Sequence, residues 1–167
     1  MPAETSKQDL ARELEHRAVS SPSAEHLMTA IASRLAQQLP HYNWVGFYLL
    51  EKGAPEKGTK QPALVLGPYV GAPTPHTRIA LDQGICGAAA SSGQTVVVDD
   101  VHADPRYLSC SIETKSEIVA PIFVQGQVVG ELDIDSHSPA AFGPDDRQLV
   151  EHCARLVGRY LEKAPIR

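Results

Sequence analysis

The sequence predicts an α+β fold, in which a central, mostly antiparallel sheet is flanked by N-terminal and C-terminal helices. Segments near both ends of the chain repeat apolar side chains every three or four residues, as amphipathic helices do. Between these ends, short β-branched or aromatic runs alternate with Gly-containing and Pro-containing turns, a pattern typical of strands. Two of these runs are joined by Gln125-Gly126, which indicates a hairpin and hence an antiparallel pair.

Residues 1–40 are expected to form two helices. Thr5 followed by Gln8 is a possible capping box for the first helix, and Ser23 is a possible N-cap for the second, which should end before Pro40. The last helix should begin at Pro144, since proline is favoured in a helix's first turn. Its expected apolar stripe is Leu149, Val150, Cys153, Leu156, Val157, Tyr160 and Leu161.

The core is expected within residues 43–163, and nothing in the composition marks a boundary, so the sequence predicts one domain over residues 1–167. A short helix is expected at 84–92, and residues 99–114 lack any period and predict a long functional loop. The expected strands are 43–50, 63–70, 78–81, 95–98, 117–124 and 127–135.

Charge and composition exclude several functions. The net charge is -5 and the basic residues are scattered, which argues against nucleic-acid binding. No stretch approaches the roughly 20 apolar residues of a membrane span, and the charged N-terminus lacks the apolar segment of a secretory signal. Three cysteines are too few for a secreted disulfide framework, so the sequence predicts a cytoplasmic protein.

Two of the three cysteines are candidates for chemistry. Cys110 lies in the long loop between Ser109 and Ser111, where a thiol can ionise and react, although cysteine is often an inert core residue. Cys86 lies in GICG, where the two glycines leave room around its sulfur, and a helix that packs closely through small residues would alone account for it. Cys153 falls in the apolar stripe of the last helix, so we expect structural burial there.

Acidic residues near two expected strands are the other candidates. Asp133 and Asp135 alternate in LDIDS and must point to the same face, and Glu131 has the same parity. Strand interiors disfavour Asp, so either this strand is a solvated edge or the pair lines a polar pocket. Glu117 precedes the apolar IVAP run. The histidine and cysteine spacings match no local zinc motif, and the phosphate-loop and nucleophile-elbow motifs are missing, so we expect no metal.

Six strings together resemble the free methionine-R-sulfoxide reductases, which are stand-alone GAF-domain enzymes. The strings occur in the family's order from about Asn43 to the end of the last helix, and they are NWVGFYLL, LVLGPYVG, GICG, DDVHADP, CSIETKSEIVAPI and GELDIDS. The resemblance implies a GAF-like fold and L-methionine (R)-S-oxide reductase activity, with no cofactor. Family members commonly carry another cysteine about ten residues before the GICG cysteine, and His76 stands near that place here.

By motif, Cys110 matches the family's catalytic cysteine, and Cys86 matches one that can take part in disulfide exchange. The substrate-pocket residues matched by motif are Glu117, Asp133, Asp135, Trp44 and Tyr48. The resemblance implies that Cys110 attacks free methionine sulfoxide, that a carboxylic acid protonates the leaving oxygen, and that thioredoxin reduces a Cys86–Cys110 disulfide. It also implies a homodimer. The alternatives are a GAF small-molecule-binding module and a cysteine redox sensor without turnover.

Overall fold

The computed structural model describes residues 5–53, 61–109 and 111–164 of the 167-residue chain. Within these residues the elements follow the order α-α-β-β-β-α-β-β-β-α, with one short 3-10 turn at Val101–Ala103 in the segment expected to be a loop. Their bounds are α1 Lys7–Ser20, α2 Ala24–Gln38, β1 Trp44–Glu51, β2 Ala63–Val70, β3 Arg78–Ala80, α3 Gly84–Ser92, β4 Val96–Val98, β5 Ser116–Val124, β6 Gln127–Ser136 and α4 Pro144–Lys163.

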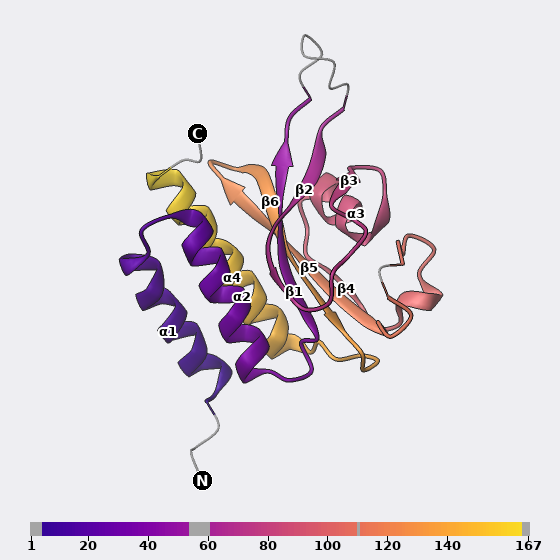
Figure 1. The fold of residues 1–167 in the computed structure, drawn as a ribbon, viewed down its shortest axis with the longest axis horizontal. Coiled ribbons are helices and arrows are strands. Elements are labelled where there is room, and N and C mark those ends of the chain that lie inside the picture. Colours follow the sequence, from indigo (N-terminus) through magenta and orange to yellow (C-terminus); the bar gives the residue numbers. More distant parts are fainter. Residues whose placement is uncertain (1–4, 54–60, 110, 165–167) are drawn as a thin grey trace.

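The strands form one six-stranded sheet in the order β3-β2-β1-β6-β5-β4, and each pairing is antiparallel. Figure 1 shows α1, α2 and α4 together on one face of this sheet and α3 on the other. Strand alternation divides the side chains between the two faces, so Val45 and Phe47 join the core under the three long helices. Trp44 and Tyr48 join the smaller core under α3. The predicted α+β fold is therefore confirmed.

Helix starts agree with the sequence in three of four cases, and the short helix expected at 84–92 is α3 with the same bounds. Ser23 caps α2 by accepting the backbone N–H of His26, and α4 begins at Pro144. The expected capping box of Thr5 and Gln8 is wrong by one residue, because Ser6 is the N-cap of α1 and accepts the N–H of Asp9. Adjacent hydroxyl residues give nearly the same local signal, so the sequence alone did not separate them.

The β5–β6 hairpin sets the register on which the acidic residues depend. Gln125 and Gly126 both have positive φ, 51° and 75°, the conformation of the two-residue turns that match sheet twist. In the antiparallel pairing that starts at this turn, Val119 lies opposite Asp133 and Glu117 lies opposite Asp135. The expected strands 117–124 and 127–135 are thus confirmed to within a residue at their ends.

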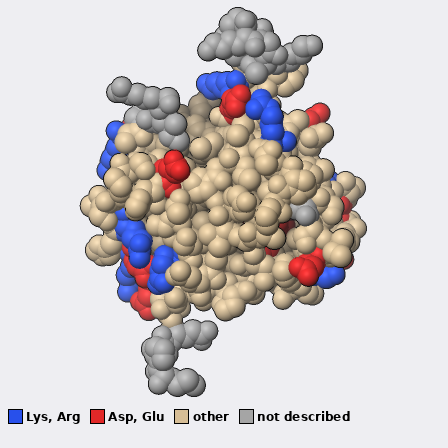
Figure 2. Space-filling view, viewed as in Figure 1, with Lys and Arg blue, Asp and Glu red and all other residues tan. Residues whose placement is uncertain are grey.

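The surface mixes both signs of charge. Figure 2 shows one face on which Lys and Arg lie around the periphery, several beside Asp or Glu, while the middle is largely uncharged. Ion pairs at the surface include Arg78–Glu51, at 3.2 Å, and Arg106–Asp104, at 2.7 Å, in which Asp104 is half-buried. Among the described residues, none of the helices has the length and apolar character needed to cross a bilayer.

A buried carboxylate joins three parts of the helical layer. Asp146, in the first turn of α4, accepts the backbone N–H of Gly143 and the hydroxyl of Tyr42, and lies 3.3 Å from the ammonium of Lys7 in α1. Burial raises the pKa of Asp146, but the bonds from Tyr42 and Gly143 and the charge of Lys7 outweigh it, and the net pKa is lowered. The ionised form therefore stabilises the fold.

We expect Asp146→Ala to lower the free energy of unfolding by about 1–3 kcal/mol, because it leaves the buried Tyr42 hydroxyl and Gly143 N–H without an acceptor. The contribution of Asp146 is complete above the ordinary aspartate pKa. It is lost as the pH falls through the lowered folded-state pKa, so wild-type stability should fall more steeply in acid than that of the variant. Urea unfolding measured across acidic pH values tests both expectations.

Tyr42→Phe is the matched control, since it removes only the hydroxyl that donates to Asp146. The two substitutions should be less destabilising together than the sum of their separate effects, because they break the same hydrogen bond. Additive effects would mean that this bond does not stabilise the fold.

Candidate active site

Four carboxylates meet on the sheet face that α3 covers. Glu131, Asp133 and Asp135 alternate along β6, and Glu117 stands opposite Asp135 on β5. Each is buried, with exposed fractions from 0% for Glu131 to 5% for Glu117 and Asp135. Of the two readings left open by the sequence, the solvated edge is wrong, because β6 lies in the middle of the sheet between β1 and β5.

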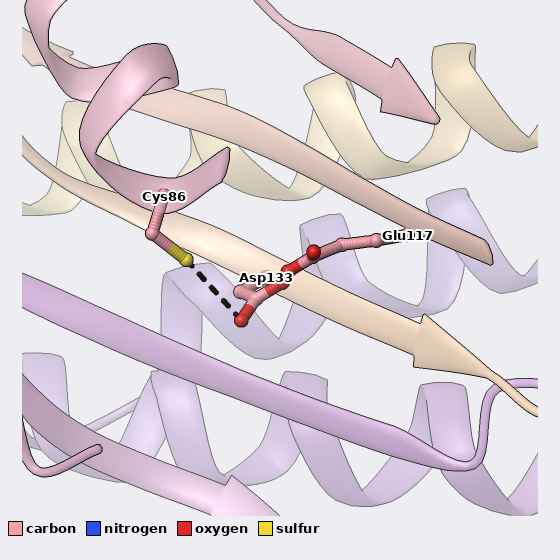
Figure 3. Close-up of side chains that lie close together, drawn as sticks. All are labelled: Cys86, Glu117 and Asp133. Carbon is pink, nitrogen blue, oxygen red and sulfur yellow. Dashed lines mark hydrogen bonds between the residues drawn. The ribbon is translucent and has the colours of Figure 1, made fainter. Parts of the chain in front are cut away.

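Helix α3 brings Cys86 onto these carboxylates. The helix lies so close to the preceding segment that a Cβ on Gly87 would be 2.8 Å from the Leu81 carbonyl oxygen, so only glycine fits there. In this position the Cys86 thiol, which is 5% exposed, donates to Asp133 Oδ2 across 3.4 Å. Figure 3 shows Cys86 and Glu117 approaching Asp133 from two different elements.

Burial and like charges raise the pKa values throughout this cluster. Burial raises the pKa of Glu117 well above its usual range, and the Asp133 and Asp135 carboxylates raise it further. The pKa of Asp135 is raised well above its usual range by burial and then by Asp133, and burial also raises the pKa of Asp133 and Glu131. The pKa of the Cys86 thiol is likewise raised, first by burial and then by Asp133 and Glu131.

Several oxygens of the cluster lack hydrogen-bond partners. Among the residues that the structure describes, the buried side-chain atoms without a partner are both carboxylate oxygens of Glu131 and one each of Asp133 and Asp135. Buried polar atoms are normally satisfied, so a concentration of unsatisfied ones at one place indicates a ligand site.

Two aromatic residues of β1 form a wall beside the acids. Trp44 and Tyr48 lie 6.3 Å apart between ring centroids, and Tyr48 OH donates to the His76 carbonyl while Trp44 Nε1 donates to the Ala72 carbonyl. Together with Asp133 and Asp135 they line a cavity of about 120 Å³. The structure therefore brings Trp44 and Tyr48 together with the acidic candidates.

The loop that carries Cys110 borders this cavity, although Cys110 itself lies outside the described residues. Ser111 lines the cavity, and its hydroxyl accepts the N–H of Glu113. On the other side of Cys110, the Ser109 carbonyl lies 2.8 Å from Nε2 of His76. No local sequence pattern predicts this contact, because His76 and Ser109 are far apart in the chain and belong to different loops.

The third cysteine is remote from the cluster. Cys153 is fully buried on α4, in the core on the opposite face of the sheet. Burial raises the pKa of its thiol to about 12. The prediction that Cys153 is a structural core residue is confirmed.

Comparisons with known proteins agree with this fold and site. Residues 23–161 match the family model for the GAF domain. Protein YtsP of Bacillus subtilis is 39% identical over 76% of this chain and 73% of its own length, and the free methionine-R-sulfoxide reductase of Escherichia coli is 34% identical over 89% and 87%.

A solved structure extends the likeness to the whole fold. The free methionine-R-sulfoxide reductase from Neisseria meningitidis, solved in complex with its substrate, superposes with a TM-score of 0.84 at 30% identity, covering 96% of this chain and 92% of that one. The family model, the sequence relatives and this structure agree, so the chain belongs to the free methionine-R-sulfoxide reductase family of GAF-domain proteins.

Proposed function

We propose that this protein reduces free methionine-R-sulfoxide to methionine, with Cys110 as the nucleophile. The observation that carries the proposal is that Asp133 and Asp135, two buried carboxyl groups that each have an unsatisfied oxygen, line a cavity bordered by the Cys110 loop. A sulfoxide needs a proton donor at its oxygen, and carboxyl groups with raised pKa values can supply one at neutral pH. The names of the relatives support the same substrate.

In the proposed reaction, the Cys110 thiolate attacks the sulfoxide sulfur while a protonated carboxyl group of Glu117, Asp133 or Asp135 donates its proton to the oxygen. The oxygen then passes to the Cys110 sulfur as the substrate's sulfur–oxygen bond and the new sulfur–sulfur bond break, so methionine leaves and Cys110 is oxidised to the sulfenic acid. An ionised member of the acid set would bind the substrate ammonium. Trp44 and Tyr48 would pack against its apolar chain.

We propose that Cys86 then condenses with the sulfenic acid, releasing water and forming a disulfide that thioredoxin reduces by exchange. The environment of Cys86 makes it a slow partner. Its thiol donates to Asp133, and burial and the surrounding carboxylates raise its pKa, so little thiolate exists at neutral pH.

For Cys86→Ser we expect one methionine per protein in the absence of a reductant, as for wild type, because the attack by Cys110 needs no second thiol. Turnover with thioredoxin should be slower than in wild type, because a sulfenic acid gives thioredoxin no disulfide to exchange. Peptide mapping after one turnover should find Cys86 linked to Cys110 in wild type.

If Cys86 stays free beside an oxidised Cys110, and Cys86→Ser recycles at the wild-type rate, an external thiol resolves Cys110 instead. Cys153→Ser serves as the matched control, since Cys153 lies on the other face of the sheet. It should behave as wild type in both measurements.

The same proposal places the protein in the reducing cytoplasm, as one domain over residues 1–167 that forms a homodimer. Composition and the family resemblance support these statements. Light scattering of the purified chain measures the oligomeric state.

A thioredoxin-coupled assay with the separated R and S diastereomers of free methionine sulfoxide tests the function. The R form should be turned over and the S form should not. A chain whose Cys110 is oxidised by peroxide but untouched by either diastereomer would be a redox sensor, and the proposal would be wrong.

A further inference from the structure

A second kind of ligand fits the acidic cluster. One atom from each of Cys86, Glu117 and Asp133 lies within 4.8 Å of the other two, and each comes from a different element, α3, β5 or β6. Figure 3 shows the three side chains converging. No local spacing motif joins them, which explains why the sequence predicted no metal.

The distance between two of these ligand atoms matches that in a tetrahedral zinc site. With a Zn–S bond of about 2.3 Å and Zn–O bonds of about 2.1 Å, tetrahedral ligand atoms lie about 3.4–3.6 Å apart. The observed separation of Cys86 Sγ from Asp133 Oδ2 is 3.4 Å. The other separations among the three ligand atoms lie within 4.8 Å, and small side-chain movements would shorten them to tetrahedral distances.

Glu131 is an independent sign of a missing ligand. It is fully buried, neither of its carboxylate oxygens has a hydrogen-bond partner, and it helps to raise the pKa of the Cys86 thiol. A divalent cation held by Cys86, Glu117 and Asp133 would offset the carboxylate charges that crowd this face of the sheet. A thiolate in the ligand set favours zinc over magnesium or calcium.

The site is also reachable. Asp133 lines the 120 Å³ cavity beside Trp44 and Tyr48, and it also lines a smaller cavity together with Cys86 and Glu117. An ion bound there would occupy the carboxylates that face the first cavity.

We propose that Cys86, Glu117 and Asp133 bind one zinc ion, with the buried Glu131 carboxyl group as an outer-shell neighbour of these ligands, and that this ion blocks the active site. Binding releases the Cys86 thiol proton to solvent as the sulfur–metal bond forms. The proposed inhibition by zinc rests on the proposed reductase function. The proposed zinc binding does not, because metal binding can be measured without substrate.

Titration of the full-length, metal-free protein with Co²⁺ tests the proposed zinc binding. We expect one equivalent to produce thiolate-to-cobalt charge-transfer absorption, which Zn²⁺ abolishes by displacement and Mg²⁺ in large excess does not. Cys86→Ser should lose the absorption, and Glu131→Gln should bind cobalt about tenfold more weakly or worse. Cys110→Ser and Cys153→Ser, the matched cysteine controls, should keep it.

Absorption that survives in Cys86→Ser, or that disappears in Cys110→Ser, would overturn the proposed ligand set. Because Cys86→Ser could fail to fold, its melting temperature without metal is compared with that of wild type. Wild-type melting in Zn²⁺ gives a second measurement, since a ligand that binds only the folded state raises the melting temperature. An unchanged wild-type melting temperature would overturn the site.

The proposed inhibition is tested by adding Zn²⁺ to the reductase assay. We expect inhibition that a chelator reverses and that Glu131→Gln weakens. Zinc binding with undiminished turnover would overturn the proposed inhibition while leaving the site intact. A chain with no reductase activity would overturn the proposed function, and the cobalt titration would still decide the metal site.

Discussion

Cys110→Ser is expected to abolish the reduction of free methionine-R-sulfoxide while leaving the fold intact. A serine hydroxyl is not ionised at neutral pH, so it is a poor nucleophile. It also has no sulfur on which a sulfenic acid could form, so neither step of the proposed reduction can take place. The flanking residues Ser109 and Ser111 are held by contacts with His76 and Glu113 that do not involve the Cys110 side chain. Measurements are single-turnover methionine release and urea unfolding.

Cys153→Ala provides the matched control, because it also removes one thiol but does so in the opposite core. It should keep full turnover and lose on the order of 1 kcal/mol of stability. Methionine release by Cys110→Ser with unchanged stability would remove Cys110 from the mechanism. A large drop in turnover for Cys153→Ala with normal stability would contradict its assignment to the core.

Local patterns predicted much of the fold because they act over a few residues. Apolar spacing placed Cys153 in the core, and strand alternation placed Asp133 and Asp135 on one face. The same pattern could not show whether that face was solvated. That depends on β6 lying between β1 and β5, a pairing between distant segments.

The site was only partly predictable for the same reason. Cys86 was a candidate through its motif, but its contact with Asp133 exists because α3 crosses the face of the sheet where β6 presents its acids. Strand alternation puts Glu131 on the same face of β6 as Asp133. Only the three-dimensional structure shows that its carboxyl group is buried without a hydrogen-bond partner. The contact between the His76 ring and the Ser109 carbonyl joins two loops, and no local sequence pattern specifies the conformation of either loop.

Asp133→Asn and Asp135→Asn are each expected to lower kcat/KM by about 100-fold or more while leaving the protein folded. Removing a general acid or its charged partner costs roughly 10²–10⁴-fold in rate. Asparagine keeps the shape and an oxygen acceptor for the Cys86 thiol, so the packing of α3 should survive. Stability should rise on the order of 1 kcal/mol, because one member of a buried group of like charges becomes neutral.

This combination of lost activity and gained stability separates a functional pocket from a structural one. Asp82→Asn is the matched control, since it makes the same chemical change at an exposed position. It should alter neither turnover nor urea midpoint. A structural role for the acids would instead lower stability together with activity in the Asp133 and Asp135 variants. If both variants keep full activity, the buried carboxylates take no part in the reaction, and the proposed proton donor must be sought elsewhere.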